Sequence, residues 1–141
     1  MEKIISNSEL ETFTLGKKFG RRCRGGEVFL LCGGLGAGKT KFVQGLAEGL
    51  GVKERVNSPT FNILKLYQRA GGNFCHVDAY RINSGHDLED LGIREYLGTA
   101  GTVTAIEWGE KVKIIWPVGA KVFDFLPTGE NRRQIIWRVN S

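Results

Sequence analysis

A cluster of glycines followed by Lys39 and Thr40 is the stretch of this sequence best suited to chemistry. Residues 33–40 read GGLGAGKT and match the pattern G-x-x-x-x-G-K-[ST] at every defined position. Glycines let such a loop curl so that its backbone N–H groups, together with the positive end of the following helix, bind phosphate oxygens. In this pattern the lysine reaches the β- and γ-phosphates, and the hydroxyl of the last residue binds Mg²⁺. The pattern therefore predicts a site for a nucleoside triphosphate.

Two other interpretations of these glycines are weaker. A dinucleotide fingerprint, G-x-G-x-x-G/A, that started at Gly34 would place Lys39 at its last position, where a small residue is needed. An ordinary loop would not explain why an apolar strand-like run, 27–32, precedes the glycines and an amphipathic helical pattern follows them. We therefore interpret residues 33–40 as a loop that binds phosphate, here called the phosphate loop.

Two acidic residues are candidates for the partners that a bound Mg²⁺ requires. Asp78 ends the apolar run NFCHVD, and Glu107 ends the run TVTAIE. One of them would hold the metal, directly or through water, while the other would orient the attacking water. Spacing alone does not assign these roles, and either residue could be an ordinary carboxylate at the end of a strand.

The segment between the phosphate-loop helix and the next strand is a candidate nucleotide switch. Residues 57–61 read NSPTF, in which Ser58 and Thr60 offer hydroxyls, Pro59 stiffens the turn and Phe61 follows. In nucleotide switches a segment at this place senses the γ-phosphate. The alternative is a loop that simply begins the next strand.

Three residues near Asp78 and Glu107 admit both a functional and a structural interpretation. His76, Asp78 and Tyr80 would share one side of a strand if the chain stayed extended through HVDAYR. A lone histidine such as His76 is more typical of a structural residue, and Trp108 is by default a packing residue.

The remaining patterns predict one α/β domain over residues 1–141. We expect a three-layer sandwich of the P-loop NTPase type, whose central sheet mixes parallel and antiparallel strands. Ser8 and Glu11 have capping-box spacing and predict a helix after Ser8. The other expected elements are strand 27–32, a helix ending near Gly51, a hairpin of strands 60–67 and 73–78, one helix or two short ones over 86–98, strand 102–108, a short helix over 109–117, and a hairpin of strands 121–126 and 133–139 around the turn 127–131.

Gly45 and Gly49 fall inside the helix that follows the phosphate loop. Each costs about 1 kcal/mol relative to alanine in a helix interior. Close packing of this helix on the sheet would explain both residues.

Composition narrows the class of protein. The chain has 141 residues, of which 41% are hydrophobic and 25% charged, as in globular domains. Because no apolar stretch approaches the length of a membrane span or of a secretory signal, we expect no membrane association. Three cysteines, without metal-ligand spacing, suggest free thiols and hence a cytoplasmic protein. The cysteines are Cys23, Cys32 and Cys75.

The net charge of +5 has a local source, because basic residues gather in 17–24, KKFGRRCR, without an acid. A second basic patch is expected near Arg132, Arg133 and Arg138. These residues could form a solvated surface, or they could contact an acidic partner or an RNA backbone.

The motifs taken together resemble one family. GGLGAGKT, SPTF, HVDAYR, LEDLGIREYL and IEWGE occur in the order and spacing of the TsaE family, also called YjeE, over residues 12–117. The resemblance implies a small bacterial ATPase, using ATP and Mg²⁺, that is needed to make threonylcarbamoyladenosine in tRNA. It implies TsaD and TsaB as partner proteins. Contact with tRNA, expected to be indirect, stays open, because the basic run 17–24 could meet either a protein or tRNA. Gly34 and Lys41 depart from the usual family pattern, but neither position has a defined ligand role.

The resemblance also implies roles for single residues. Thr40 and Glu107 would bind Mg²⁺, while Asp78 and Lys39 would support hydrolysis. Trp108 would lie near the nucleotide. The residues Ser58, Pro59, Thr60 and Phe61 would form the switch, and those binding the nucleotide would be Thr12, Leu35, Gly36, Ala37, Gly38, Lys39, Thr40 and Trp108.

Two other functions compete with an ATPase that drives a tRNA-modifying complex. A P-loop kinase for a small molecule needs an acceptor-binding segment and usually an arginine-bearing lid, but the available stretches, 52–57 and 83–98, are short, and the second is acidic. A binding switch with slow hydrolysis overlaps with the first function. The base-reading motif N-K-x-D is absent from the sequence, and the resemblance favours ATP.

Overall fold

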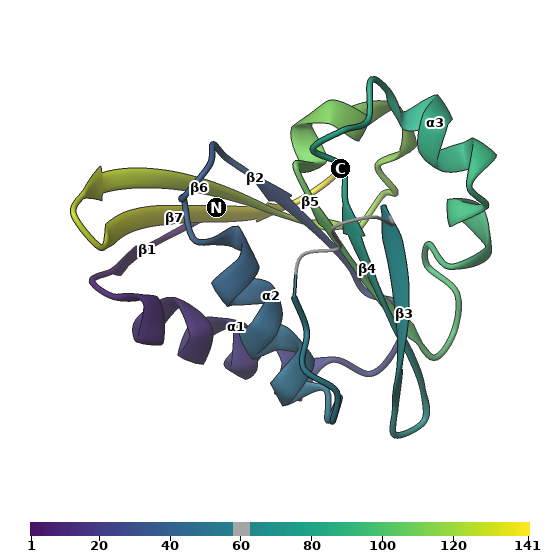
Figure 1. Cartoon of the computed structure of the whole chain (residues 1–141), viewed down its shortest axis with the longest axis horizontal. Coiled ribbons are helices and arrows are strands. Elements are labelled where there is room, and N and C mark those ends of the chain that lie inside the picture. Colours follow the sequence, from purple (N-terminus) through teal and green to yellow (C-terminus); the bar gives the residue numbers. More distant parts are fainter. Residues whose placement is uncertain (58–62) are drawn as a thin grey trace.

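A seven-stranded sheet in the order β1-β7-β6-β2-β5-β4-β3 forms the centre of the structure (Figure 1). The structure is a computed structural model that describes residues 1–57 and 63–141, so the predicted switch residues Ser58–Phe61 lie outside the described residues. The strands are β1 (Glu2–Ser6), β2 (Val28–Cys32), β3 (Leu64–Arg69), β4 (Gly72–Asp78), β5 (Thr102–Glu107), β6 (Lys121–Gly129) and β7 (Arg132–Val139). The helices are α1 (Glu9–Arg22), α2 (Lys39–Gly49) and α3 (Gly85–Asp90), with 3₁₀ segments η1 (Ile93–Glu95) and η2 (Gly109–Ile115).

The sheet mixes parallel and antiparallel strands, as predicted. β2 runs parallel to both β5 and β6, and β4 runs parallel to β5. The pairs β1–β7, β6–β7 and β3–β4 are antiparallel. The parallel centre brings the carboxyl ends of β2, β5 and β4 to one edge of the sheet, which is where such sheets place their ligands.

Helices cover both faces of the sheet, so the predicted three-layer sandwich is confirmed (Figure 1). On one face α1 and α2 pack over a cluster of phenylalanines in which the rings of Phe42 and Phe123 lie 4.8 Å apart. On the other face α3, η1 and η2 cover a mainly aliphatic cluster. None of the described helices is both long and apolar enough to cross a membrane.

The interior glycines of α2 pack against α1, not against the sheet as the sequence had suggested. A Cβ atom at Gly45 would lie 1.9 Å from the carbonyl oxygen of Phe13. At Gly16, Gly20 and Gly49 it would lie 2.1 to 2.3 Å from a carbonyl oxygen of the facing helix. The two helices therefore touch backbone to backbone, because glycines stand at i, i+4 spacing on each of them.

Most element predictions are confirmed, with corrections at the ends of the chain. The Ser8 hydroxyl accepts a hydrogen bond from the Glu11 N–H at 3.0 Å and caps α1. Residues 86–98 form two short helices, separated by Gly92 at φ 82°. Strand β6 continues to Gly129, so the turn into β7 is shorter than the predicted one. Strand β1 was not predicted, because it is short and forms by pairing with β7, more than a hundred residues away.

Candidate functional site

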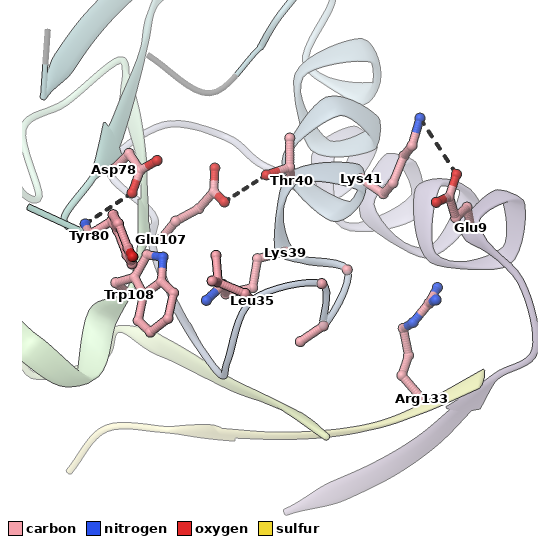
Figure 2. A pocket seen from close by; sticks show the side chains of 13 residues that line it. Glu9, Leu35, Lys39, Thr40, Lys41, Asp78, Tyr80, Glu107, Trp108 and Arg133 are labelled. Carbon is pink, nitrogen blue, oxygen red and sulfur yellow. Dashed lines mark hydrogen bonds and ion pairs between the residues drawn. The ribbon is translucent and has the colours of Figure 1, made fainter. Parts of the chain in front are cut away.

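A cleft of about 370 Å³ lies over the glycine loop at the carboxyl edge of the sheet. In Figure 2, Asp78, Glu107 and Trp108 lie on one side of the loop, and Arg133 lies on the other. The cleft is lined by residues from five segments: Glu9 of α1, Leu35–Lys41 of the loop and α2, Asp78 and Tyr80 at the end of β4, Glu107 and Trp108 at the end of β5, and Arg133 of β7.

The loop that follows β2 uses glycine where its backbone requires it. Gly33, Gly36 and Gly38 have φ values of 143°, 73° and 102°, a range that side chains disfavour. Open space surrounds the Cβ positions of Gly34 and Gly36, so a ligand can approach the backbone there. Helix α2 begins directly after Gly38 and aims its amino end at the cleft. This geometry suits an anion such as a phosphate.

The Lys39 side chain is buried at the base of the cleft. Its ammonium donates a hydrogen bond to the Gly33 carbonyl and lies 3.6 Å from the centroid of the Trp108 ring. Burial lowers the pKa of Lys39, while the carboxylates of Glu110 and Glu107 oppose that shift. A cation removed from water in this way interacts strongly with a phosphate that enters the same space.

Glu107 holds the centre of a buried hydrogen-bond chain. One of its carboxylate oxygens, Oε1, accepts from the Thr40 hydroxyl at 2.9 Å, and the other, Oε2, lies 2.7 Å from Nε2 of His76. Only 3% of Glu107 and none of His76 is exposed. Thr40 and Glu107 thus stand together at the amino end of α2.

Asp78 ends β4 directly beside Glu107, with which it is paired in the register of β4 and β5. Its Oδ1 accepts a hydrogen bond from the Tyr80 N–H at 3.0 Å. In an extended chain, Tyr80 would lie on the same side of the strand as His76 and Asp78. The strand ends at Asp78, so Tyr80 does not continue this alternation. Tyr80 reaches the cleft through a turn, and the centroid of its ring lies 5.1 Å from that of the Trp108 ring.

Trp108 has an unusual backbone conformation for a bulky residue. Its φ of 61° and ψ of 40° lie in the left-handed region, where a large side chain is an outlier. This conformation places the indole over Lys39 and beside Tyr80. Residues held in such conformations concentrate at functional sites.

The comparisons with known proteins agree with this geometry. The family model described as threonylcarbamoyl adenosine biosynthesis protein TsaE matches residues 6–135. The chain belongs to the TsaE family. It is 43% identical to a tRNA threonylcarbamoyladenosine biosynthesis protein TsaE of Treponema pallidum, over 78% of this chain and 80% of the relative. It is 38% identical to the TsaE protein of Bacillus subtilis, over 89% of this chain and 77% of that one.

A solved member of the same fold extends the likeness over the whole chain. The crystal structure of Bacillus subtilis YdiB matches with a TM-score of 0.80 at 29% identity, over 99% of this chain and 86% of that chain. The α/β fold predicted from the sequence patterns is therefore shown for the sheet and for the helices on both of its faces.

The structure gathers most of the predicted TsaE site residues into the cleft, but not Thr12. The predicted residues that line the cleft are Leu35, Gly36, Ala37, Gly38, Lys39, Thr40, Asp78, Glu107 and Trp108. Thr12 is fully buried, and its hydroxyl accepts from the Arg133 guanidinium at 2.7 Å. Thr12 would therefore affect a bound nucleotide only through Arg133, which lines the cleft.

Four lining residues were not predicted to line the TsaE site. Lys41 of α2 and Glu9 of α1 form an ion pair at 3.9 Å. Tyr80 lies in the turn after β4, and Arg133 lies in β7. A Cβ at Gly38 would lie 2.9 Å from the Arg133 Cδ, so the arginine packs against the loop itself. No local pattern marks Arg133, since the pairing of β1, β7 and β6 brings it there. Arg132 is exposed and donates to Asn7 at 3.1 Å.

The residues present fit a magnesium ion better than a softer metal. Among the described residues, no group of three His, Cys, Asp or Glu side chains could hold a metal by itself. The Thr40 hydroxyl and the Glu107 carboxylate nevertheless offer hard oxygen ligands 2.9 Å apart. Mg²⁺ is typically held by one or two such groups, together with phosphate oxygens and water.

Proposed function

We propose that this chain binds Mg·ATP in the cleft and hydrolyses it in support of tRNA threonylcarbamoyladenosine synthesis. One observation carries the proposal: Lys39, Thr40, Asp78 and Glu107 come from three segments and meet over one phosphate loop. The family membership supports the pathway in this proposal, and the residues of the site support the reaction type.

Each group in the cleft has a distinct task in this proposal. The backbone N–H groups of the loop bind the phosphates, and Lys39 exchanges the Gly33 carbonyl for phosphate oxygens. Thr40 and Glu107 hold Mg²⁺, which when bound neutralises charge that develops on the phosphate oxygens. Asp78 lies at the neighbouring strand end, where its carboxylate orients the attacking water.

Partner proteins complete the reaction in this proposal. Among the described residues that line the cleft, Asp78 is the one carboxylate left to orient water, because Glu107 contacts Thr40 and Glu9 pairs with Lys41. We therefore expect slow hydrolysis by the isolated chain and faster hydrolysis when TsaD and TsaB order the site. We expect tRNA to act through those partners.

A phosphate-release assay tests this function. ATP turnover is measured for the isolated chain, with TsaD–TsaB, and with TsaD–TsaB plus tRNA, and Asp78→Asn serves as the inactive control. The proposal predicts a rise in turnover on adding TsaD–TsaB. Full turnover by the isolated chain, unchanged by partners, would refute regulated hydrolysis. A phosphorylated small molecule as product would indicate the kinase instead.

A further inference from the structure

A buried histidine stands behind the proposed metal ligand. Along β4, Phe74, His76 and Asp78 alternate on the face that α1 and α2 cover. His76 is fully buried, although most of its neighbours on this face are apolar. The Phe74 ring stacks on the imidazole, with the ring centroids 6.2 Å apart and an interplanar angle of 11°. A histidine in such a place requires a polar partner.

The partner of His76 is the oxygen of Glu107 that faces away from Thr40. Nε2 of His76 lies 2.7 Å from Oε2, while Oε1 accepts from Thr40. An ionised carboxylate only accepts hydrogen bonds, so Nε2 carries the proton. Nδ1 is buried and has no hydrogen-bond partner among the described residues. Within residues 1–57 and 63–141 the imidazole thus makes a single polar contact, which is with Glu107.

The contacts of His76 indicate a task in holding Glu107 as well as in filling the core. A leucine at position 76 would fill apolar space without leaving a buried nitrogen unpaired, but it would take away the hydrogen bond at Oε2 of Glu107. Among the described residues, the histidine leaves its Nδ1 atom unpaired, and its Nε2 atom holds one oxygen of the Glu107 carboxylate. Ligand carboxylates in metal sites are oriented by hydrogen bonds of this kind from residues that do not touch the metal.

We propose that His76 is a positioning residue that sets the orientation of the Glu107 carboxylate. By holding Oε2, the Nε2–H group directs Oε1 to Thr40 and to the place of the magnesium ion. This inference rests on the proposed function, because it assigns His76 to the same Mg·ATP site. It adds a residue that acts through Glu107 and contacts neither nucleotide nor metal.

Three substitutions at one position test the hydrogen bond. In His76→Gln the amide nitrogen can occupy the place of the imidazole Nε2. In His76→Asn the same amide is one carbon too short, and His76→Leu removes the polar group altogether. Val77→Ala, on the opposite face of β4, is a control for general loss of packing. The readout is calorimetric ATP binding at rising Mg²⁺ concentration, with thermal unfolding measured in parallel.

The proposal predicts that Asn and Leu weaken the Mg²⁺ affinity of the ATP complex about tenfold or more, as loss of such outer contacts does. Gln should stay within about threefold of the wild type, and ATP binding without Mg²⁺ should be unchanged in all three. Equal Mg²⁺ affinity in wild type and His76→Leu would overturn the positioning role, whatever happens to the unfolding temperature. So would a Gln variant that is folded but as impaired as Leu. If the ATP affinity of the wild type did not depend on Mg²⁺, the proposed function itself would be overturned, and the inference with it.

Discussion

Glycine serves opposite purposes in two neighbouring regions, the phosphate loop and the interface of α1 with α2. In the loop, Gly36 has a positive φ, and open space surrounds its Cβ position. In the helices, Gly16, Gly20, Gly45 and Gly49 would each drive a Cβ into the backbone of the facing helix. The loop leaves its backbone open to the cleft, whereas the helices leave theirs free to contact each other.

The comparison shows that the second region supports the first. Lys39 and Thr40 stand on the first turn of α2, and α1 holds that helix at backbone contact distance. The direction in which the amino end of α2 points is therefore set by a glycine interface on the far side of the helix. Function and packing can be separated by changing one set of glycines at a time.

The largest expected effect is on stability. Gly45→Ala would gain about 1 kcal/mol from helix propensity, but it must push a methyl group against the Phe13 carbonyl. Overpacking costs up to about 3 kcal/mol, so we expect a net loss of about 2 kcal/mol in the free energy of unfolding. Urea unfolding checks this value. A variant as stable as the wild type would mean that α1 and α2 do not touch backbone to backbone.

The next effect separates the two carboxylates. Asp78→Ala should lower partner-stimulated turnover about a hundredfold, the typical contribution of a group that handles a proton. Its Mg·ATP affinity should change much less. Glu107→Ala should instead weaken the Mg²⁺ dependence of ATP binding, since Glu107 is the carboxylate that contacts Thr40. A Mg²⁺ titration of both variants decides the matter, and the reverse order would exchange the two roles.

A spectroscopic effect follows from the contact between Lys39 and Trp108. The ammonium lies 3.6 Å from the ring centroid and must leave when it binds phosphate, so Mg·ATP should change the tryptophan emission. Trp116→Phe and Trp137→Phe should retain this change, because neither residue lines the cleft. Trp108→Phe should lose it. If Trp108→Phe kept the change in emission, the change would not come from movement of Lys39 away from Trp108.

The smallest effect is expected for the matched glycine in the loop. Gly34 has no atom within 4 Å of its Cβ position and does not have a positive φ. Gly34→Ala should change the free energy of unfolding by less than about 0.5 kcal/mol, as surface changes usually do. The same urea experiment, run beside Gly45→Ala, measures the contrast. A loss as large as that of Gly45→Ala would remove the distinction between the two regions.

Local patterns sufficed for much of the fold and site, and long-range contacts account for the rest. Adjacent residues determine the phosphate loop, the cap at Ser8 and the strand ends at Asp78 and Glu107, so these features could be predicted from the sequence. Strand β1 and the place of Arg133 depend on pairing across the chain. The packing partner of Gly45 was predicted wrongly, because propensity shows that a glycine is costly but not which surface it meets.

The central claim is that the cleft binds ATP through the phosphate loop, and calorimetry of Lys39→Ala tests it most directly. ATP is titrated with and without Mg²⁺ into the wild type, into Lys39→Ala and into Lys53→Ala, which removes an exposed lysine from the loop after α2. We predict Mg²⁺-dependent binding for the wild type and Lys53→Ala, and loss of that binding in a folded Lys39→Ala. Unchanged Mg·ATP affinity in Lys39→Ala would contradict the account.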